Sequence, residues 1–226
     1  MQPSPETEKT QLIKGLKQLK LHYTEKQTNQ LLEYARLLQK WNQIHNLISA
    51  KDNQHIIKRH ILDSLNLGSY LDTYYSNSNS NSTAISNGIL DFGTGGGLPG
   101  LPLAILYPHH TFTLVDSNHK KTAFLHYCKT QLKLNNIKPL CQRIEENKNL
   151  YPLIITRAAG EITELIKCVV PQLNDNGIML AMLGGKPTEE NMKQIKHRIK
   201  KFRLDKLELD FNQGKRHILI VWKPSD

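Results

Sequence analysis

A short run of glycines between two apolar segments carries the strongest chemical signal in the chain. Residues 89–92 (ILDF) indicate a buried strand, residues 93–97 (GTGGG) a turn, and a helix is expected to follow around Pro99. Glycine lets the backbone turn sharply and lets a ligand approach closely, and the free N–H groups that begin a helix attract a carboxylate or phosphate. Asp116 closes the next apolar strand, 21 residues after Gly95, where a carboxylate can accept hydrogen bonds from both ribose hydroxyls of an adenosine. The pattern predicts a site for an adenosine-containing cofactor.

Two cofactors fit these glycines. The phase Gly95-x-Gly97-x-x-Gly100 matches the dinucleotide fingerprint, which would make the chain a NAD-dependent oxidoreductase. The earlier phase, Asp91-x-Gly93-x-Gly95-x-Gly97, favours S-adenosylmethionine, because Asp91 would face the cationic methionine end and opposite charges attract in a partly dry site. We therefore expect methyl transfer, with the oxidoreductase as the alternative and a purely structural glycine turn as a third interpretation.

Other catalytic signatures are missing from the sequence. The three cysteines, Cys128, Cys141 and Cys168, form no CxxC pair and no HExxH occurs, which predicts a reducing cytoplasm and no metal site. Arg157 follows the expected strand 152–156, where methylation of an adenine amine or of cytosine C5 would call for [ND]PP[YFW] or Pro-Cys. Arg157 could position cofactor or RNA phosphate, or pair structurally with an acid. The Arg59-His60-x-x-Asp63 motif leaves the same choice open between RNA contact and internal pairing.

Charge points to a polyanionic partner. Thirty Lys and Arg against twenty Asp and Glu give the 226 residues a formal net charge of +10, which favours nucleic acid, with a solvated basic surface as the alternative. No stretch approaches the roughly 20 apolar residues of a membrane span, and the polar N-terminus lacks the apolar region of a signal peptide. We expect a cytoplasmic monomer that binds no membrane.

Helical patterns fill the first 70 residues. Leucines 12, 16 and 19 recur at helical spacing, and Thr24 with Gln27 forms a capping box that opens a second helix. Residues 54–71 repeat the apolar stripe and predict a third helix. Residues 76–83 (SNSNSNST) cannot form a core and predict an exposed loop. The expected organisation is a helical segment over 1–75 packed on a catalytic domain, a Ser/Asn-rich loop over 76–86, and that domain over 87–226.

From Ile89 onward strands alternate with helices. Further strands are expected at 111–115, 138–142, 152–156 and 178–183, with helices at 120–132, 161–170 and 188–201. Leu207, Leu209 and Phe211 alternate before a turn at 212–214 and the apolar run 217–222, which indicates a final hairpin. This succession predicts a doubly wound α/β sheet, mostly parallel, with one reversed edge strand.

The motifs together resemble one family. The segments WNQIHNLIS (41–49), RHILDSL (59–65), LDFGTGGGLPGLPLAI (90–105), FTLVDS (112–117), RIEE (143–146), ITRA (155–158) and GKRHILIV (214–221) are similar to bacterial ribosomal RNA small subunit methyltransferase G, also called glucose-inhibited division protein B. The resemblance implies a class I S-adenosylmethionine-dependent methyltransferase fold: a Rossmann-like, seven-stranded, mostly parallel sheet with a reversed terminal hairpin, preceded by N-terminal helices. It implies methylation of guanine N7 in the 530 loop, in the decoding region of 16S ribosomal RNA. Since N7 carries an accessible lone pair, no catalytic base is expected.

The resemblance also implies site residues. The cofactor would be bound by Gly93, Gly95, Leu98, Asp116, Ile144, Glu145 and Arg157, and RNA by Lys186, Lys215 and Arg216. Three departures stand out: GTGGG replaces the family's GTGPG, RAAG replaces RAFA, and LGGK replaces LKG with the lysine displaced to position 186. The last two leave open a non-catalytic RNA-binding protein that retains a degenerate methyltransferase fold.

Overall fold

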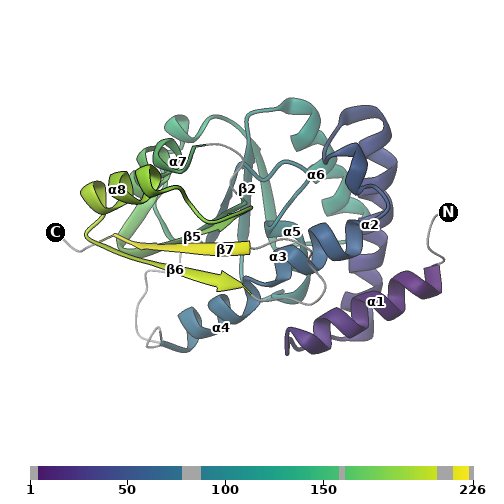
Figure 1. The fold of residues 1–226 in the computed structure, drawn as a ribbon. Helices are drawn as coiled ribbons and strands as arrows, with labels where there is room; N and C mark the ends of the chain where they lie inside the picture. Colours follow the sequence, from purple (N-terminus) through teal and green to yellow (C-terminus); the bar gives the residue numbers. More distant parts are fainter. Residues whose placement is uncertain (1–4, 78–87, 158–160, 208–215, 224–226) are drawn as a thin grey trace.

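A seven-stranded sheet forms the centre of the computed structural model, which describes residues 5–77, 88–157, 161–207 and 216–223 (Figure 1). The strand order is β3-β2-β1-β4-β5-β7-β6. The strands are β1 (Ile89–Phe92), β2 (Phe112–Asp116), β3 (Ile137–Cys141), β4 (Tyr151–Arg157), β5 (Leu173–Leu183), β6 (Lys201–Leu207) and β7 (Arg216–Trp222). Strands β1 to β5 pair in parallel, whereas β7 lies antiparallel between β5 and β6. The predicted mostly parallel sheet with a reversed terminal hairpin is confirmed, but the reversed strand β7 lies second from the edge, because β6 pairs with its outer side.

Helices cover both faces of the sheet. They are α1 (Pro5–Gln18), α2 (Glu25–His45), α3 (Asp63–Leu65), α4 (Gly68–Asn77), α5 (Gly100–Leu106), α6 (His119–Gln131), α7 (Ile162–Val169) and α8 (Glu189–Arg198), with a π-helical segment η2 (Ile57–Leu62) before α3. Successive strand residues point to opposite faces. Ile89 and Ile155 therefore pack in one core with α1 to α6, while Leu90 and Ile154 pack in a second core with α7 and α8.

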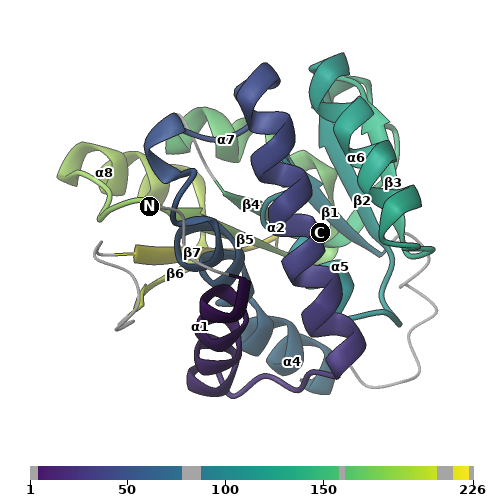
Figure 2. The same cartoon turned by 90° about the vertical axis from the view of Figure 1, so that its right-hand side faces the viewer.

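The N-terminal helices add a layer beneath the glycine turn. The capping box is confirmed, since Gln27 N donates to Thr24 Oγ1 at 3.3 Å and Thr24 N donates to Gln27 Oε1 at 2.8 Å. Helix α2 then crosses beside α5 and α6 (Figure 2). Its buried Tyr34 donates from the hydroxyl to Gly96 O at 2.6 Å. A helix at the start of the chain thus holds the turn that follows β1.

The predicted continuous helix over residues 54–71 is wrong. The backbone passes from the π-helical segment η2 into the short α3, and α4 begins only at Gly68. The Asn66 side chain donates to Leu62 O at 3.1 Å and to Asp63 O at 2.9 Å, which satisfies carbonyls where the helix is interrupted. Ile57, Ile61 and Leu65 are buried as expected, because burial periodicity does not distinguish one turn of π-helix from α-helix.

Two boundaries near the C-terminus also differ from the prediction. Helix α8 ends at Arg198 rather than near 201, and β6 starts at Lys201. The reason is alternation: Phe202 and Leu204 both pack against the core beneath α7 and α8, which a strand allows. Leu209, Phe211 and the turn at 212–214 lie outside the described residues, as does most of the Ser/Asn-rich tract.

Candidate functional site

Two cavities open at the carboxyl edge of the parallel strands. Strand β1 lies between β2 and β4, so the chain crosses to opposite sides after β1 and after β3, and this is where ligands bind in open α/β sheets. The first cavity, of about 620 Å³, lies over the ends of β1, β2 and β4 and reaches the residues after β3. The second, of about 650 Å³, lies over the ends of β1, β4 and β5 and the start of β7. Gly93, Lys121 and Arg157 line both, so the cavities adjoin.

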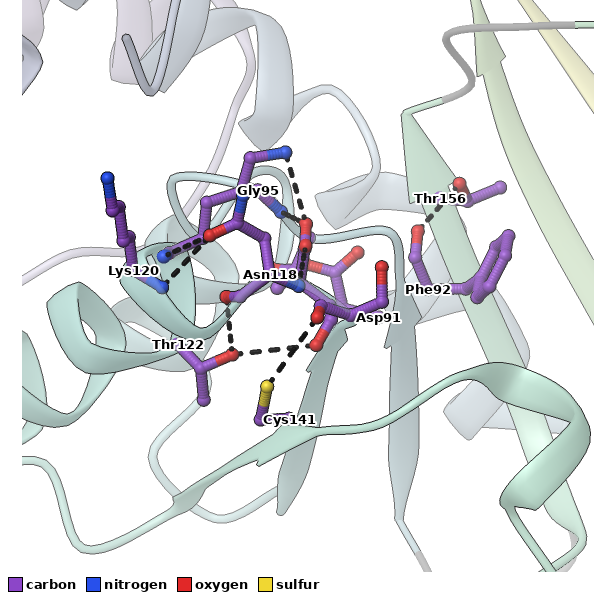
Figure 3. Close-up of polar contacts among 12 residues, drawn as sticks. Asp91, Phe92, Gly95, Asn118, Lys120, Thr122, Cys141 and Thr156 are labelled. Carbon is purple, nitrogen blue, oxygen red and sulfur yellow. Dashed lines mark hydrogen bonds and ion pairs between the residues drawn. The ribbon is translucent and has the colours of Figure 1, made fainter. Parts of the chain in front are cut away.

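Asp116 lines the first cavity. Its carboxylate accepts from Gly95 N at 3.0 Å, from Asn118 N at 2.9 Å and from Lys121 Nζ at 3.5 Å. Asn118 in turn caps α6 by accepting from Lys120 N and Lys121 N (Figure 3). A carboxylate offers about four acceptor positions. Asp116 is thus fixed between the turn and α6 and retains capacity for a further donor.

Asp91 has a different position from the one expected. It is fully buried, and its Oδ2 accepts from Thr94 Oγ1 at 2.5 Å and from Gly100 N at 2.8 Å. Burial raises the pKa of this carboxyl to about 7, against the lowering effect of those two hydrogen bonds. Asp91 lines neither cavity. It ties the turn to the start of α5 and does not face the methionine end of a cofactor.

The third glycine of the dinucleotide phase has a packing role. A Cβ on Gly100 would lie 2.6 Å from Asp91 Oδ2 and 2.5 Å from Leu114 Cδ2. The close approach of α5 to β1 therefore requires glycine at this position. Gly93 differs, because it has φ of +66° and its Cβ position has no atom within 4 Å, so bare backbone faces both cavities.

The remaining cofactor candidates divide between the two cavities. Ile144 is buried and Glu145 exposed, and both line the first cavity beside Arg157. Gly95 and Leu98 line the second. The first cavity is also lined by three residues that were not predicted as site residues: Lys121, Gln142 and Cys168. The signal for Lys121 was its place in the first turn of a helix that directly follows Asp116.

An ionic network around the buried Asp63 and His60 lines the second cavity. Asp63 Oδ1 accepts from Arg216 Nε at 3.1 Å, and Asp63 Oδ2 lies 4.0 Å from Arg157 Nη1. Arg157 Nη1 also lies 2.9 Å from His60 Nδ1, and Arg59 pairs with Asp52 at 2.5 Å. Burial and the nearby Arg157 lower the pKa of His60 to about 3. The RHxxD motif therefore makes internal pairs and also lines a cavity.

The three RNA-binding candidates have different positions. Arg216 lines the second cavity. Lys186 is exposed beyond the end of β5, and Gly184, two residues before it, lines that cavity in its place. Lys215 lies outside the described residues, as do positions 158–160 of the RAAG departure.

The described residues contain no helix with the length and apolar content that crossing a bilayer requires. Nor do they bring three or more His, Cys, Asp or Glu side chains together in a group that could hold a metal ion.

Solved structures share the fold. The methyltransferase domain of METTL16 superposes with a TM-score of 0.56 at 16% identity, over 74% of this chain and 69% of that one. The N-terminal domain of human METTL16, solved in complex with SAH, gives a TM-score of 0.55 at 16% identity, over 73% and 71% of the two chains. These likenesses confirm a methyltransferase fold.

Sequence relatives are much closer. The family model for rRNA small subunit methyltransferase G (GidB) matches residues 27–219. Ribosomal RNA small subunit methyltransferase G of Cellvibrio japonicus (strain Ueda107) is 38% identical over 213 residues, covering 93% of each chain. That of Francisella tularensis subsp. tularensis (strain WY96-3418) is 36% identical over 215 residues, covering 95% of this chain and 97% of the relative. These matches overrule the NAD-dependent oxidoreductase, and the chain belongs to the ribosomal RNA small subunit methyltransferase G family.

Proposed function

We propose that this protein transfers the methyl group of S-adenosylmethionine to N7 of a guanine in the 530 loop of 16S ribosomal RNA. The observation that carries the proposal is the pair of adjoining cavities, which share Gly93 and Arg157 at the end of the parallel strands. A methyl transferase must hold two reactants in line and in contact. The first cavity would hold the cofactor and the second the acceptor nucleotide.

The first cavity suits S-adenosylmethionine. The spare acceptor capacity of Asp116 matches a ribose hydroxyl, and its side chain, 9% exposed, lines the first cavity. Ile144 offers an apolar contact for the adenine ring, and Glu145 offers an acceptor for its amino group. The open space over Gly93 admits a ligand where any side chain would project. When bound, the cofactor supplies the methyl group, and its sulfur keeps the electron pair of the broken bond.

Guanine N7 needs no proton removed before it is alkylated. Its lone pair forms the new bond directly, so the protein's contribution is alignment of the reactants rather than general base catalysis. His60, which lines the second cavity, is a weak base, because burial and the nearby Arg157 lower its pKa to about 3. Arg157, on the wall that both cavities share, is placed to orient ligands on either side.

A labelled-methyl assay tests the proposal. Purified protein is incubated with labelled S-adenosylmethionine and either small subunits or deproteinised 16S RNA that lack the modification, and the product is mapped for 7-methylguanosine. The expected result is one labelled guanine in the 530 loop. Absence of transfer to both substrates would contradict the proposal.

Asp116→Ala separates an enzyme from a protein that only binds RNA. Loss of the ribose acceptor and of the turn contacts should reduce cofactor affinity at least a hundredfold, since the change removes several charge-assisted hydrogen bonds. Affinity for 16S RNA should change less than about threefold. Full methylation by this variant would remove Asp116 from the cofactor site.

The setting of the reaction belongs to the same proposal. The net charge of +10 favours RNA as the partner. We infer that the protein acts as a monomer in the cytoplasm, without a metal ion or a membrane.

A further inference from the structure

In the lining of the second cavity, cationic side chains outnumber carboxylates. Four cationic side chains and two carboxylates line it: Arg59, Lys121, Arg157, Arg216, Asp52 and Asp63. His60 adds no charge near neutral pH, because burial holds its pKa at about 3. A guanidinium has no acceptor atom, so the 2.9 Å contact to Arg157 Nη1 requires His60 Nδ1 to accept. The cavity is therefore suited to an anion.

Asp63 lies beneath the two arginines. Its side chain is 1% exposed, whereas those of Arg157 and Arg216 are 25% and 29% exposed. Arg216 donates to Asp63 from Nε, and its terminal nitrogens make no other hydrogen bond within the part of the chain that the structure describes. A buried carboxylate in contact with two partly exposed guanidinium groups offsets the repulsion between them and fixes their orientation.

The backbone that precedes Asp63 is π-helical. Asp63 follows directly on the π-helical segment η2, and π-helical turns are rare and recur at functional sites. His60 and Asp63 are both buried there, and both reach Arg157 at the end of β4. One interrupted helix thus orients an arginine 94 positions further along the chain and another 153 positions further.

We propose that Asp63 is a positioning residue that holds Arg157 and Arg216 on the wall of the second cavity, where they bind a phosphate of the RNA nucleotide to be methylated. The inference rests on the proposed function, because it places the acceptor in this cavity. Guanidinium forks match the geometry of phosphate oxygens. The base itself is a poorer partner for two arginines, since alkylation of N7 makes the purine cationic.

Asp63→Asn and Arg216→Gln test the assignment in the full-length protein. Each should raise KM for RNA about tenfold while kcat changes less than about threefold, as expected for loss of one charge-assisted contact. Each should also lower the slope of log affinity against log salt concentration by about 0.7, the value for one single-strand phosphate. Adding Asp63→Asn to Arg216→Gln should raise KM by a smaller factor than Asp63→Asn does in wild type, because only the effect through Arg157 remains.

A merely structural role for Asp63 gives a different pattern. Thermal stability would fall, but KM and the salt slope of the folded fraction would stay at the wild-type values, and this result would overturn the proposal. Asp205→Asn is the matched control, since Asp205 pairs with Arg203 at 2.8 Å on β6, outside both cavities. It should leave KM and slope unchanged.

A neutral backbone linkage identifies the phosphate. Synthetic RNA carrying the target loop is made with a methylphosphonate 5′ or 3′ of the target guanosine. One of the two should weaken binding by wild type about tenfold and leave binding by Arg216→Gln unchanged. Equal loss in both proteins, or none in wild type, would overturn the phosphate assignment.

Binding is measured at equilibrium in the presence of S-adenosylhomocysteine, so it does not depend on turnover. Wild type that binds the RNA but transfers no methyl group would contradict the proposed function and leave the phosphate contact to be judged on affinity. Methyl transfer together with unchanged affinity in both variants would contradict the positioning role alone.

Discussion

Asp91 and Asp116 show that two carboxylates at the ends of neighbouring strands can have opposite roles. Asp116 is partly open to a cavity and bound by three donors. Asp91 is sealed under the glycine turn and satisfies Thr94 and Gly100. The turn that binds a ligand on one side is therefore held by an internal acid on the other.

Asp91 should make stability depend on pH. Its pKa in the folded protein is about 7, above the ordinary 3.8, so the folded state keeps a proton that the unfolded chain releases between those values. This contribution to stability is complete below about pH 4 and is lost as the pH rises through about 7. Asp91→Asn cannot titrate, so wild type should lose stability relative to the variant from about pH 4 to about pH 7, by on the order of 1 kcal/mol per pH unit.

Chemical denaturation of both proteins at several pH values measures this difference. If the stabilities of wild type and Asp91→Asn differ by the same amount at every pH from about 4 to about 7, Asp91 is already ionised in the folded protein, and the prediction is wrong.

The sequence predicted the site residues at strand ends, but it did not predict pairs between residues that are far apart in the chain. All of the residues expected at or just after strand ends line the first cavity, namely Gly93, Asp116, Ile144, Glu145 and Arg157. The expectation that Asp91 faces the cofactor was wrong, because strand alternation alone does not tell which polar side chain is covered. The pairing of Asp63 with Arg216 joins residues 153 positions apart, and no local pattern encodes it.

At the scale of elements, the contact between β1 and α5 depends on the absence of a side chain at Gly100. Gly100→Ala would push a methyl group against Asp91 and Leu114. We expect a loss of roughly 1 to 3 kcal/mol, as for other overpacked sites, and weaker cofactor binding because the turn moves. Thermal unfolding and calorimetry with S-adenosylmethionine measure both effects.

Gly185→Ala is the control for that substitution. An added Cβ at Gly185 meets no atom within 4 Å, so stability should change by less than about 0.5 kcal/mol. Equal losses in the two variants would mean that glycine flexibility, not the close approach of α5 to β1, decides the result.

The sequence predicted which segments form helices and strands, but it predicted neither the π-helical segment η2 nor the start of β6. Buried Ile57, Ile61 and Leu65 fit a helix and gave no sign of the π-helical segment that contains two of them. The final strand pair was recognised from alternation, but β6 begins at Lys201, inside the predicted basic helix. Tertiary packing of Phe202 and Leu204 outweighed the helical propensity of the lysines around them.

At the scale of the whole molecule, net charge should control RNA affinity. Each single-strand phosphate contact should make RNA binding about 2.6-fold weaker when the salt concentration rises from about 50 to about 200 mM. S-adenosylmethionine affinity should change less than about twofold, because few charges are exchanged. Salt titrations with the two ligands measure this contrast, and equal sensitivity would argue against an electrostatic RNA surface.

The charge of the second cavity has a consequence for product release. The acceptor base enters neutral and leaves as a cation, yet the side chains around it stay as they were, with four positive groups against two negative ones. The same surplus that draws in a phosphate is unfavourable to the methylated purine. Under the proposed reaction, the charge of this cavity would thus favour release of the methylated product over its retention.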